Sequence, residues 1–204
     1  MNKKIKNIIF DLGNVILKAT PSIVLNNINI TDEQKQNIKN TFFSNWDELD
    51  LGNETIEEHF NKSGISDNLK NDVKEILINY YKYRAFNTEI IELMKRLKGN
   101  NYKIYILSNN NKEAYKYLHN LPLFECVDGW IVSCDYHINK PDERLYQILF
   151  KNYMLNPKEC FFIDDKKLNI ETGKLLGMNG HILNFEKYGI IELVRDLEEN
   201  GIKI

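Results

Sequence analysis

Three short apolar runs, each ending on a polar side chain, constrain the fold of this chain more than any other feature of its sequence. The runs and their last residues are 6–11 with Asp11, 103–108 with Ser108, and 160–164 with Asp164. Continuous apolar runs of this length are typical of strands that are buried on both faces of a sheet.

Strands and helices alternate along the second half of the chain. Two further short strands are expected at residues 130–133 and 180–183, and amphipathic helices separate all the strands after residue 88. This alternation predicts an α/β protein with a doubly wound, Rossmann-like parallel sheet that is covered by helices on both faces.

Residues 19–85 have a different pattern, which contains helix signals only. Thr20 precedes a proline at a first helical position, and Ser66 precedes a run with helical spacing of apolar residues. Thr31 and Thr55 each stand three residues before Gln or Glu, as in a capping box. We therefore expect a helical cap domain at residues 19–85, inserted into a core domain formed by residues 1–18 and 86–204.

Composition excludes several classes of protein. The 204 residues carry a net charge of −2, which argues against nucleic-acid binding and against a polybasic membrane anchor. The 3 cysteines form no C-x-x-C pair, so neither a disulfide scaffold nor a zinc site is expected. The chain begins with too short an apolar run for a signal peptide, and it has no transmembrane stretch. We expect a soluble, cytoplasmic protein, a monomer or weak homodimer whose partner is a small molecule.

The polar residues at the strand ends point to phosphate chemistry. In parallel sheets, ligands bind beyond the carboxyl ends of the strands. The side chains expected there are Asp11, Ser108, Asp164 and Asp165, together with Lys140 from the intervening segment. Carboxylates from two strands can hold a cation such as Mg²⁺, whereas a lysine and a hydroxyl can hold phosphoryl oxygens.

Four ordered motifs resemble those of the haloacid dehalogenase (HAD) superfamily. They are Asp11-Leu-Gly-Asn-Val, Ile-Leu-Ser108-Asn109, Lys140-Pro141-Asp142 and Phe-Ile-Asp164-Asp165-x-x-x-Asn169. The resemblance covers essentially the whole chain, and it is strongest to small-cap sugar phosphatases similar to α-D-glucose-1-phosphate phosphatase. It implies a HAD core with an inserted helical cap and a Mg²⁺-dependent phosphomonoester hydrolase activity on a small phosphorylated metabolite, a sugar phosphate.

The resemblance assigns the metal site and the nucleophile. Asp11 would attack phosphorus and form an aspartyl-phosphate intermediate. Mg²⁺ would be held by Asp11, Asp165 and the backbone carbonyl of Gly13. Asp164 and Asn169 would lie behind these ligands and orient the waters on the metal.

The resemblance also assigns the phosphoryl-binding groups. Ser108, the backbone N–H of Asn109 and Lys140 would contact the group being transferred. Asn110 and Asn111, which follow Ser108 and Asn109, are expected to be loop residues without a functional role.

Gly13 departs from the usual pattern, because most phosphatases of this superfamily have a second aspartate there that acts as general acid and base. Three explanations are open. The leaving group could need little protonation, or a cap carboxylate from Asp47, Glu48 or Asp50 could reach the site. The third explanation is that the protein turns over poorly or not at all, and a non-catalytic phosphometabolite-binding or interaction protein is the corresponding alternative function. Haloacid dehalogenation is a less favoured alternative, because adjacent carboxylates without a cation would repel one another.

Two cap residues have uncertain roles. Trp46 is expected to belong to the apolar core of the cap, and stacking of its ring on a sugar is the alternative. Arg84 could bind a second anionic group or could lie along the surface near the hinge. The sequence does not identify the substrate.

Overall fold

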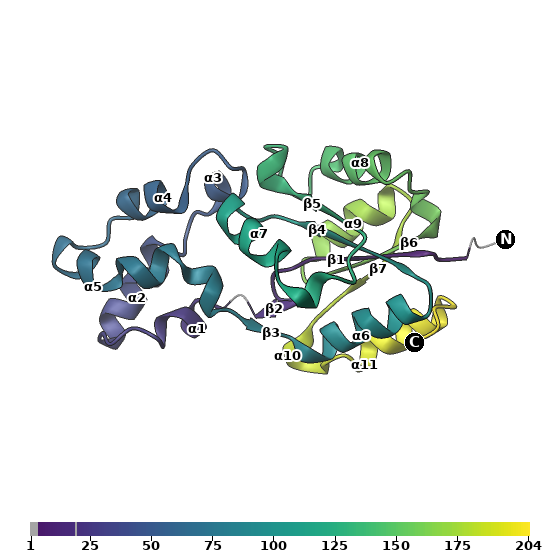
Figure 1. Cartoon of the computed structure of the whole chain (residues 1–204), viewed down its shortest axis with the longest axis horizontal. Coiled ribbons are helices and arrows are strands. Elements are labelled where there is room, and N and C mark those ends of the chain that lie inside the picture. The colour runs from purple at the N-terminus through teal and green to yellow at the C-terminus, as the bar shows by residue number, and fades with distance from the viewer. Residues whose placement is uncertain (1–3, 19) are drawn as a thin grey trace.

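The computed structural model describes residues 4–18 and 20–204, and its core is a five-stranded parallel sheet (Figure 1). The strand order is β5-β4-β1-β6-β7. The strands are β1 (Asn7–Phe10), β4 (Lys103–Ser108), β5 (Gly129–Val132), β6 (Cys160–Asp164) and β7 (Asn179–Ile182). The predicted Rossmann-like α/β fold is confirmed.

Successive residues of the central strands pack into two different apolar cores. In β1, Ile8 and Phe10 belong to the core on one face of the sheet, and Ile9 belongs to the core on the other. Ile106 and Leu107 of β4 divide in the same way. Because side chains alternate across a strand, burial on both faces requires an apolar residue at every position. This explains the uninterrupted apolar runs in the sequence.

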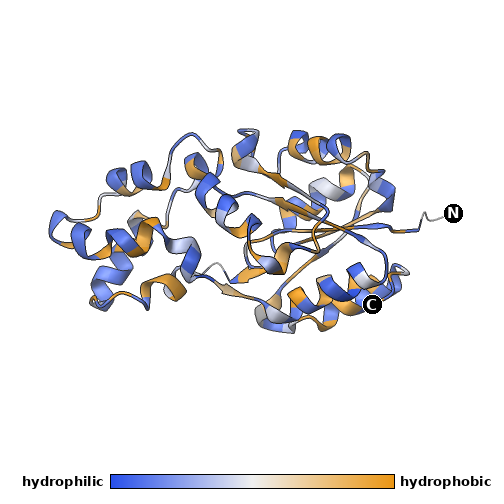
Figure 2. Cartoon of the chain, in the orientation of Figure 1, coloured by the Kyte–Doolittle hydropathy of each residue, from blue (hydrophilic) through white to orange (hydrophobic). Residues whose placement is uncertain are grey.

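Helices cover both faces of the sheet (Figure 1). Side chains of α6 (Thr88–Gly99) and α11 (Ile191–Glu199) fill one core, and side chains of α8 (Glu143–Asn152) and α9 (Lys167–Leu175) fill the other. The sheet is mostly hydrophobic, whereas the helices carry hydrophilic residues on part of their surface (Figure 2). The remaining elements of this part are α7 (Lys112–His119), α10 (Phe185–Tyr188), and the 3-10 turns η2 (Pro122–Phe124), η3 (Ser133–Asp135) and η4 (Pro157–Glu159). No helix of the described residues is long and apolar enough to cross a membrane.

Residues 20–83, which follow β1 and precede α6, are mainly helical and have an apolar core of their own. Its elements are α1 (Pro21–Leu25), α2 (Asp32–Thr41), α3 (Asp47–Asp50), α4 (Ile56–Lys62), α5 (Asp67–Ile78) and the 3-10 turn η1 (Tyr80–Tyr83). Phe42, Phe60 and Leu77 are among the buried side chains of this separate cluster. We call this helical segment the cap.

The boundaries of the cap differ slightly from the sequence expectation. A two-stranded antiparallel ribbon of β2 (Leu17–Lys18) and β3 (Ala85–Phe86) joins the two ends of the segment, so the helical structure ends before residue 85. Both predicted capping boxes, at Thr31 and Thr55, are present. Thr20 and Ser66 precede their helices as expected, but neither side chain makes the capping hydrogen bond.

The cap docks directly on the strand ends of the core. Gly52, at a φ of +71°, lies so close to Cys134 that an added Cβ would be 2.7 Å from the Cys134 carbonyl oxygen. The side-chain amide of Asn111 donates a hydrogen bond to the Tyr80 hydroxyl, and Ala114 of α7 is part of the apolar cluster of the cap. Only a glycine satisfies both the left-handed backbone and the close approach at position 52.

The buried side chains of the central sheet are expected to contribute most to the stability of the fold. Replacing the fully buried Ile106 by alanine should lower the free energy of unfolding by about 2–5 kcal/mol, because the site cannot collapse around the cavity. Leu175→Ala, at a side chain that is 82% exposed, is the control and should have little effect. Urea denaturation measures the free energy of unfolding of both variants, and an equal decrease in the two would contradict this prediction.

Candidate active site

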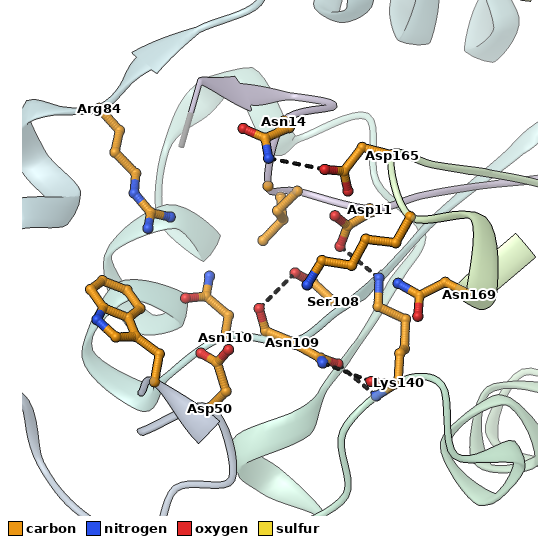
Figure 3. A pocket seen from close by; sticks show the side chains of 14 residues that line it. Asp11, Asn14, Asp50, Arg84, Ser108, Asn109, Asn110, Lys140, Asp165 and Asn169 are labelled. Atoms are coloured by element: carbon orange, nitrogen blue, oxygen red, sulfur yellow. Dashed lines mark hydrogen bonds and ion pairs between the residues drawn. The ribbon is translucent and has the colours of Figure 1, made fainter. Parts of the chain in front are cut away.

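The parallel sheet brings the predicted polar residues to one edge. β1 lies between β4 and β6, and Asp11, Ser108 and Asp164 stand at the carboxyl ends of these three strands. A cavity of about 150 Å³ opens there between the core and the cap (Figure 3). It is lined by Asp11, Leu12, Gly13, Asn14, Trp46, Asp50, Arg84, Ser108, Asn109, Asn110, Lys140, Asp165, Lys166 and Asn169.

Three carboxylates crowd the core side of this cavity. Ligand oxygens of Asp11, Asp164 and Asp165 all lie within 4.8 Å of one another. Burial raises the pKa of Asp11 to about 6; Lys140 opposes this rise, and the neighbouring acids Asp164 and Asp165 add to it. Burial also raises the pKa of Asp165, although a hydrogen bond from Asn14 opposes the rise. The fold therefore holds these groups together against their repulsion.

Lys140 is the cation that bridges this cluster. Its Nζ donates to Asp11 Oδ1 at 2.7 Å, to Asp164 Oδ2 at 2.6 Å and to the Leu107 carbonyl at 2.8 Å. Burial alone would lower the pKa of Lys140, but its two carboxylate partners raise it above the usual value. All three ammonium protons are thus used, and the side chain remains charged.

The charge of the cluster suits a divalent cation. When the three carboxylates are ionised they carry three negative charges, whereas Lys140, which pairs with Asp11 and Asp164, carries one positive charge. Lys166 also lines the cavity and opposes the rise in the pKa of Asp165, so the two lysines together still leave an excess of negative charge. Carboxylate oxygens in such a group are the donors that Mg²⁺ prefers. The residues present therefore fit the metal that the sequence pattern suggests.

Hydrogen bonds divide the three acids into two kinds. Asp164 accepts from Lys140, from the backbone N–H of Lys166 at 2.8 Å, and from the Asn169 amide at 2.9 and 3.0 Å. Both of its oxygens are therefore engaged by protein donors. Asp11 and Asp165 carry fewer such bonds, which favours them as direct ligands and favours Asp164 and Asn169 as supports.

The loop after β4 is built around Lys140. The Asn109 amide donates to the Lys140 carbonyl at 3.1 Å, and the Lys140 N–H donates back to Asn109 Oδ1 at 2.7 Å. Ser108 Oγ lies 3.3 Å from the Asn109 carbonyl oxygen to which it donates. The Asn109 side chain thus positions Lys140, and only its backbone N–H is a candidate for the predicted phosphoryl contact.

Several residues of the cavity were not predicted from sequence. Asn110, which we expected to be a plain loop residue, lines the cavity and is buried. Asn111 instead caps α7 by accepting a hydrogen bond from the Ala114 N–H. Lys166 also lines the cavity. Its position directly after the acidic pair, at the end of a buried strand, is the signal in the sequence that indicates this placement.

The two uncertain cap residues both reach the cavity. Trp46 lines the cavity, but it also makes contacts within the cap. Its Nε1 donates to the Phe42 carbonyl at 2.7 Å, and its ring stacks on that of Phe43 with 5.7 Å between the ring centres. The Trp46 side chain therefore forms part of the apolar core of the cap and also part of the cavity wall. The Arg84 guanidinium lies 4.7 Å from the centre of the Tyr80 ring and 5.7 Å from that of Trp46.

Comparison with known proteins identifies the family. The sequence pattern of the haloacid dehalogenase-like hydrolases matches residues 5–177. This chain belongs to that family. The matched residues include Asp11, Ser108, Lys140, Asp164 and Asp165, which the structure brings together at one edge of the sheet.

Individual relatives of this hydrolase are distant. (S)-2-haloacid dehalogenase 4A of Burkholderia cepacia is 29% identical over 108 residues, which are 52% of this chain and only 47% of that protein. The D-ribitol-5-phosphate phosphatase of Bacteroides thetaiotaomicron is 25% identical over 187 residues, covering 85% of this chain and 89% of that protein. A HAD family enzyme from the same organism, solved with magnesium and inorganic phosphate, matches with a TM-score of 0.62 at 22% identity, over 87% of this chain and 93% of that one.

The crowded carboxylates predict a distinctive response to metal. Asp165 has a raised pKa in the folded protein, so its ionised form destabilises the fold at neutral pH. Asp165→Asn should therefore unfold at the same or a higher temperature than the wild type without metal, and it should lose most of the rise in melting temperature that millimolar Mg²⁺ causes.

Thermal denaturation with and without Mg²⁺ measures both effects. Asp72→Asn, at an exposed residue of α5, is the matched control and should keep the full response to Mg²⁺. An equal response in Asp165→Asn and wild type would show that Asp165 does not hold the cation.

Proposed function

We propose that this hydrolase is a Mg²⁺-dependent phosphomonoesterase that acts on a small phosphorylated metabolite, a sugar phosphate, through an aspartyl-phosphate at Asp11. The observation that carries the proposal is the cluster of Asp11, Asp164 and Asp165, in which Lys140 pairs with Asp11 and Asp164. The excess of negative charge in this cluster suits a cation, and a carboxylate next to that cation is a suitable nucleophile for phosphorus.

The residues of the core would divide the work as follows. Lys140 holds Asp11 by a hydrogen bond to Oδ1, and the other carboxylate oxygen attacks phosphorus. Asp11, Asp165 and the carbonyl of Gly13 would hold Mg²⁺, which when bound supplies the positive charge that phosphoryl oxygens require. Because Asp164 is held by three donors, it keeps Lys140 and the start of α9 in place.

The phosphoryl group would be held opposite the metal. Ser108 and Asn109, at the end of β4, line the cavity beside Asp11, and Lys140 lies between them and Asp164. A hydroxyl, a backbone N–H and an ammonium at such a site stabilise the negative charge on the transferring group. Catalysis would then rest on position and charge rather than on further covalent chemistry.

The relatives support a phosphatase over a dehalogenase. The phosphatase relative aligns along most of both chains, whereas the dehalogenase relative aligns along about half of each. The structural neighbour with magnesium and phosphate bound has the same fold. A halide-releasing site has no need for a cation, so three adjacent acids there would repel one another without compensation.

The cap side of the cavity favours a small polar substrate. Trp46 presents an aromatic surface and Arg84 a cation, and Asn110 of the core loop after β4 adds an amide, around a volume of about 150 Å³. An aromatic ring with neighbouring hydrogen-bonding groups is suited to the apolar face and the hydroxyls of a sugar. This is the basis for choosing a sugar phosphate.

The proposal is tested by phosphate release from a panel of sugar phosphates in the presence of Mg²⁺. Asp11→Asn should lower kcat by more than about 10³-fold, because the attacking carboxylate is lost. Asp72→Asn should retain full activity, since that side chain is exposed on α5 and does not line the cavity. Unchanged phosphate release in Asp11→Asn would contradict the proposal.

A chelator distinguishes phosphate ester hydrolysis from dehalogenation. Removing Mg²⁺ should abolish phosphate release. Chloride release from a 2-haloacid that a chelator does not affect would instead identify a dehalogenase.

A further inference from the structure

We propose that Asp50, at the end of cap helix α3, is the general acid and base of the reaction. It would replace the second aspartate of related phosphatases, whose position is occupied here by Gly13. This inference rests on the proposed phosphatase function and assigns a catalytic residue to it. It also selects one of the three cap carboxylates that the sequence left open.

The first argument is position. Asp50 lines the same cavity as Asp11 and Gly13, and it lies across that cavity from Asp165 and Lys140 (Figure 3). The other carboxylates of this helical turn, Asp47 and Glu48, are exposed and do not line the cavity. A leaving group attached to phosphorus beside Asp11 would therefore extend towards Asp50.

The second argument is the absence of a competing partner. Within residues 4–18 and 20–204, the carboxyl group of Asp50 forms no hydrogen bond and no ion pair. Arg84 is the cation that opposes the rise in the pKa of Asp50 most, yet its guanidinium lies over the rings of Tyr80 and Trp46 and forms no ion pair with Asp50 among the described residues. Asp50 is thus free to exchange a proton with a substrate or a water.

The third argument is the charge around Asp50. Burial raises its pKa to about 7. Arg84 and Lys166 oppose this rise, whereas Asp47 on its own helix and Asp11 at the end of β1 add to it. A carboxyl with a pKa near the working pH can both give and take a proton, which is what general acid–base catalysis requires.

The fourth argument is how the core fixes this turn of the cap. Ser133 Oγ donates a hydrogen bond to the backbone carbonyl of Asp50, and the same hydroxyl accepts one from the Asn110 N–H at 3.0 Å. Two residues further on, Gly52 packs against Cys134. Docking of the cap on η3 therefore places Asp50 in the cavity, so closure and delivery of the acid are the same event.

The proton balance is complete with these two aspartates. In the first step, an Asp11 oxygen bonds to phosphorus, the ester P–O bond breaks, and the leaving oxygen takes the Asp50 proton. In the second step, ionised Asp50 takes a proton from water, the water oxygen bonds to phosphorus, and the P–O bond to Asp11 breaks. Inorganic phosphate leaves, and both aspartates return to their starting forms.

The test compares Asp50→Asn with Asp47→Asn on two probes. Glycerol 3-phosphate has a poor alkoxide leaving group, whereas p-nitrophenyl phosphate has a leaving group that needs little protonation. Asp50→Asn should lower kcat/KM for glycerol 3-phosphate by about 10²–10⁴-fold. The same variant should keep the first-turnover burst of p-nitrophenol near the wild-type rate and then turn over slowly, because the second step lacks its base. Asp47→Asn should behave as the wild type on both probes.

The pH dependence of kcat/KM provides a second readout, and it is measured in the wild type and in Asp50→Asn. Protonated Asp50 is the form that acts first, so wild-type kcat/KM for glycerol 3-phosphate should fall as the pH rises above about 7. This alkaline limb should be absent from Asp50→Asn.

Three outcomes would overturn the inference, and they are distinct. An active wild type with an equally active Asp50→Asn overturns the role of Asp50 and leaves the phosphatase function intact. An equal loss on both probes, including the first-turnover burst, assigns Asp50 to substrate binding instead. A wild type that releases phosphate from neither probe nor from the sugar phosphate panel overturns the phosphatase function itself.

Discussion

The ion pairs of Lys140 with Asp11 and Asp164 are the interaction on which the rest of the site depends. They join the ends of β1 and β6 to the loop before α8, and they are buried beneath the cavity. Buried charges are stable only when they are paired and hydrogen-bonded, and here every proton of the ammonium has an acceptor. The three acids carry more charge than this lysine balances, so this edge of the sheet is a candidate site for a cation.

The cap completes the site rather than merely covering it. The core supplies the carboxylates, the lysine and the serine, whereas the cap supplies Asp50, Trp46 and Arg84. Contacts at Gly52 and Asn111 fix the position of the cap on the core. The cavity is therefore lined by groups from both parts, and the proposed reaction would require the cap to be docked on the core.

The fold and the core half of the site were predictable because both follow from local patterns. Buried parallel strands must be apolar at every position, and their carboxyl ends must meet at one edge, so Asp11, Ser108 and Asp164 were expected together. The cap half was much harder to predict. Asp47, Glu48 and Asp50 are equivalent in sequence, and only the docking of α3 on η3 separates the one that lines the cavity from the two that face solvent.

The sequence by itself determined the α/β architecture, the helical insertion and the acids, lysine and hydroxyl at the strand ends, because these depend on periodicity and on short motifs. Only the tertiary structure decided how these groups share charge and which cap residues join them. The pairing of Lys140 with Asp11 and Asp164, the support of Asp164 by Asn169, and the placement of Asp50 depend on distances between segments far apart in the chain. Such distances are set by packing between elements, and no local pattern of residues encodes them.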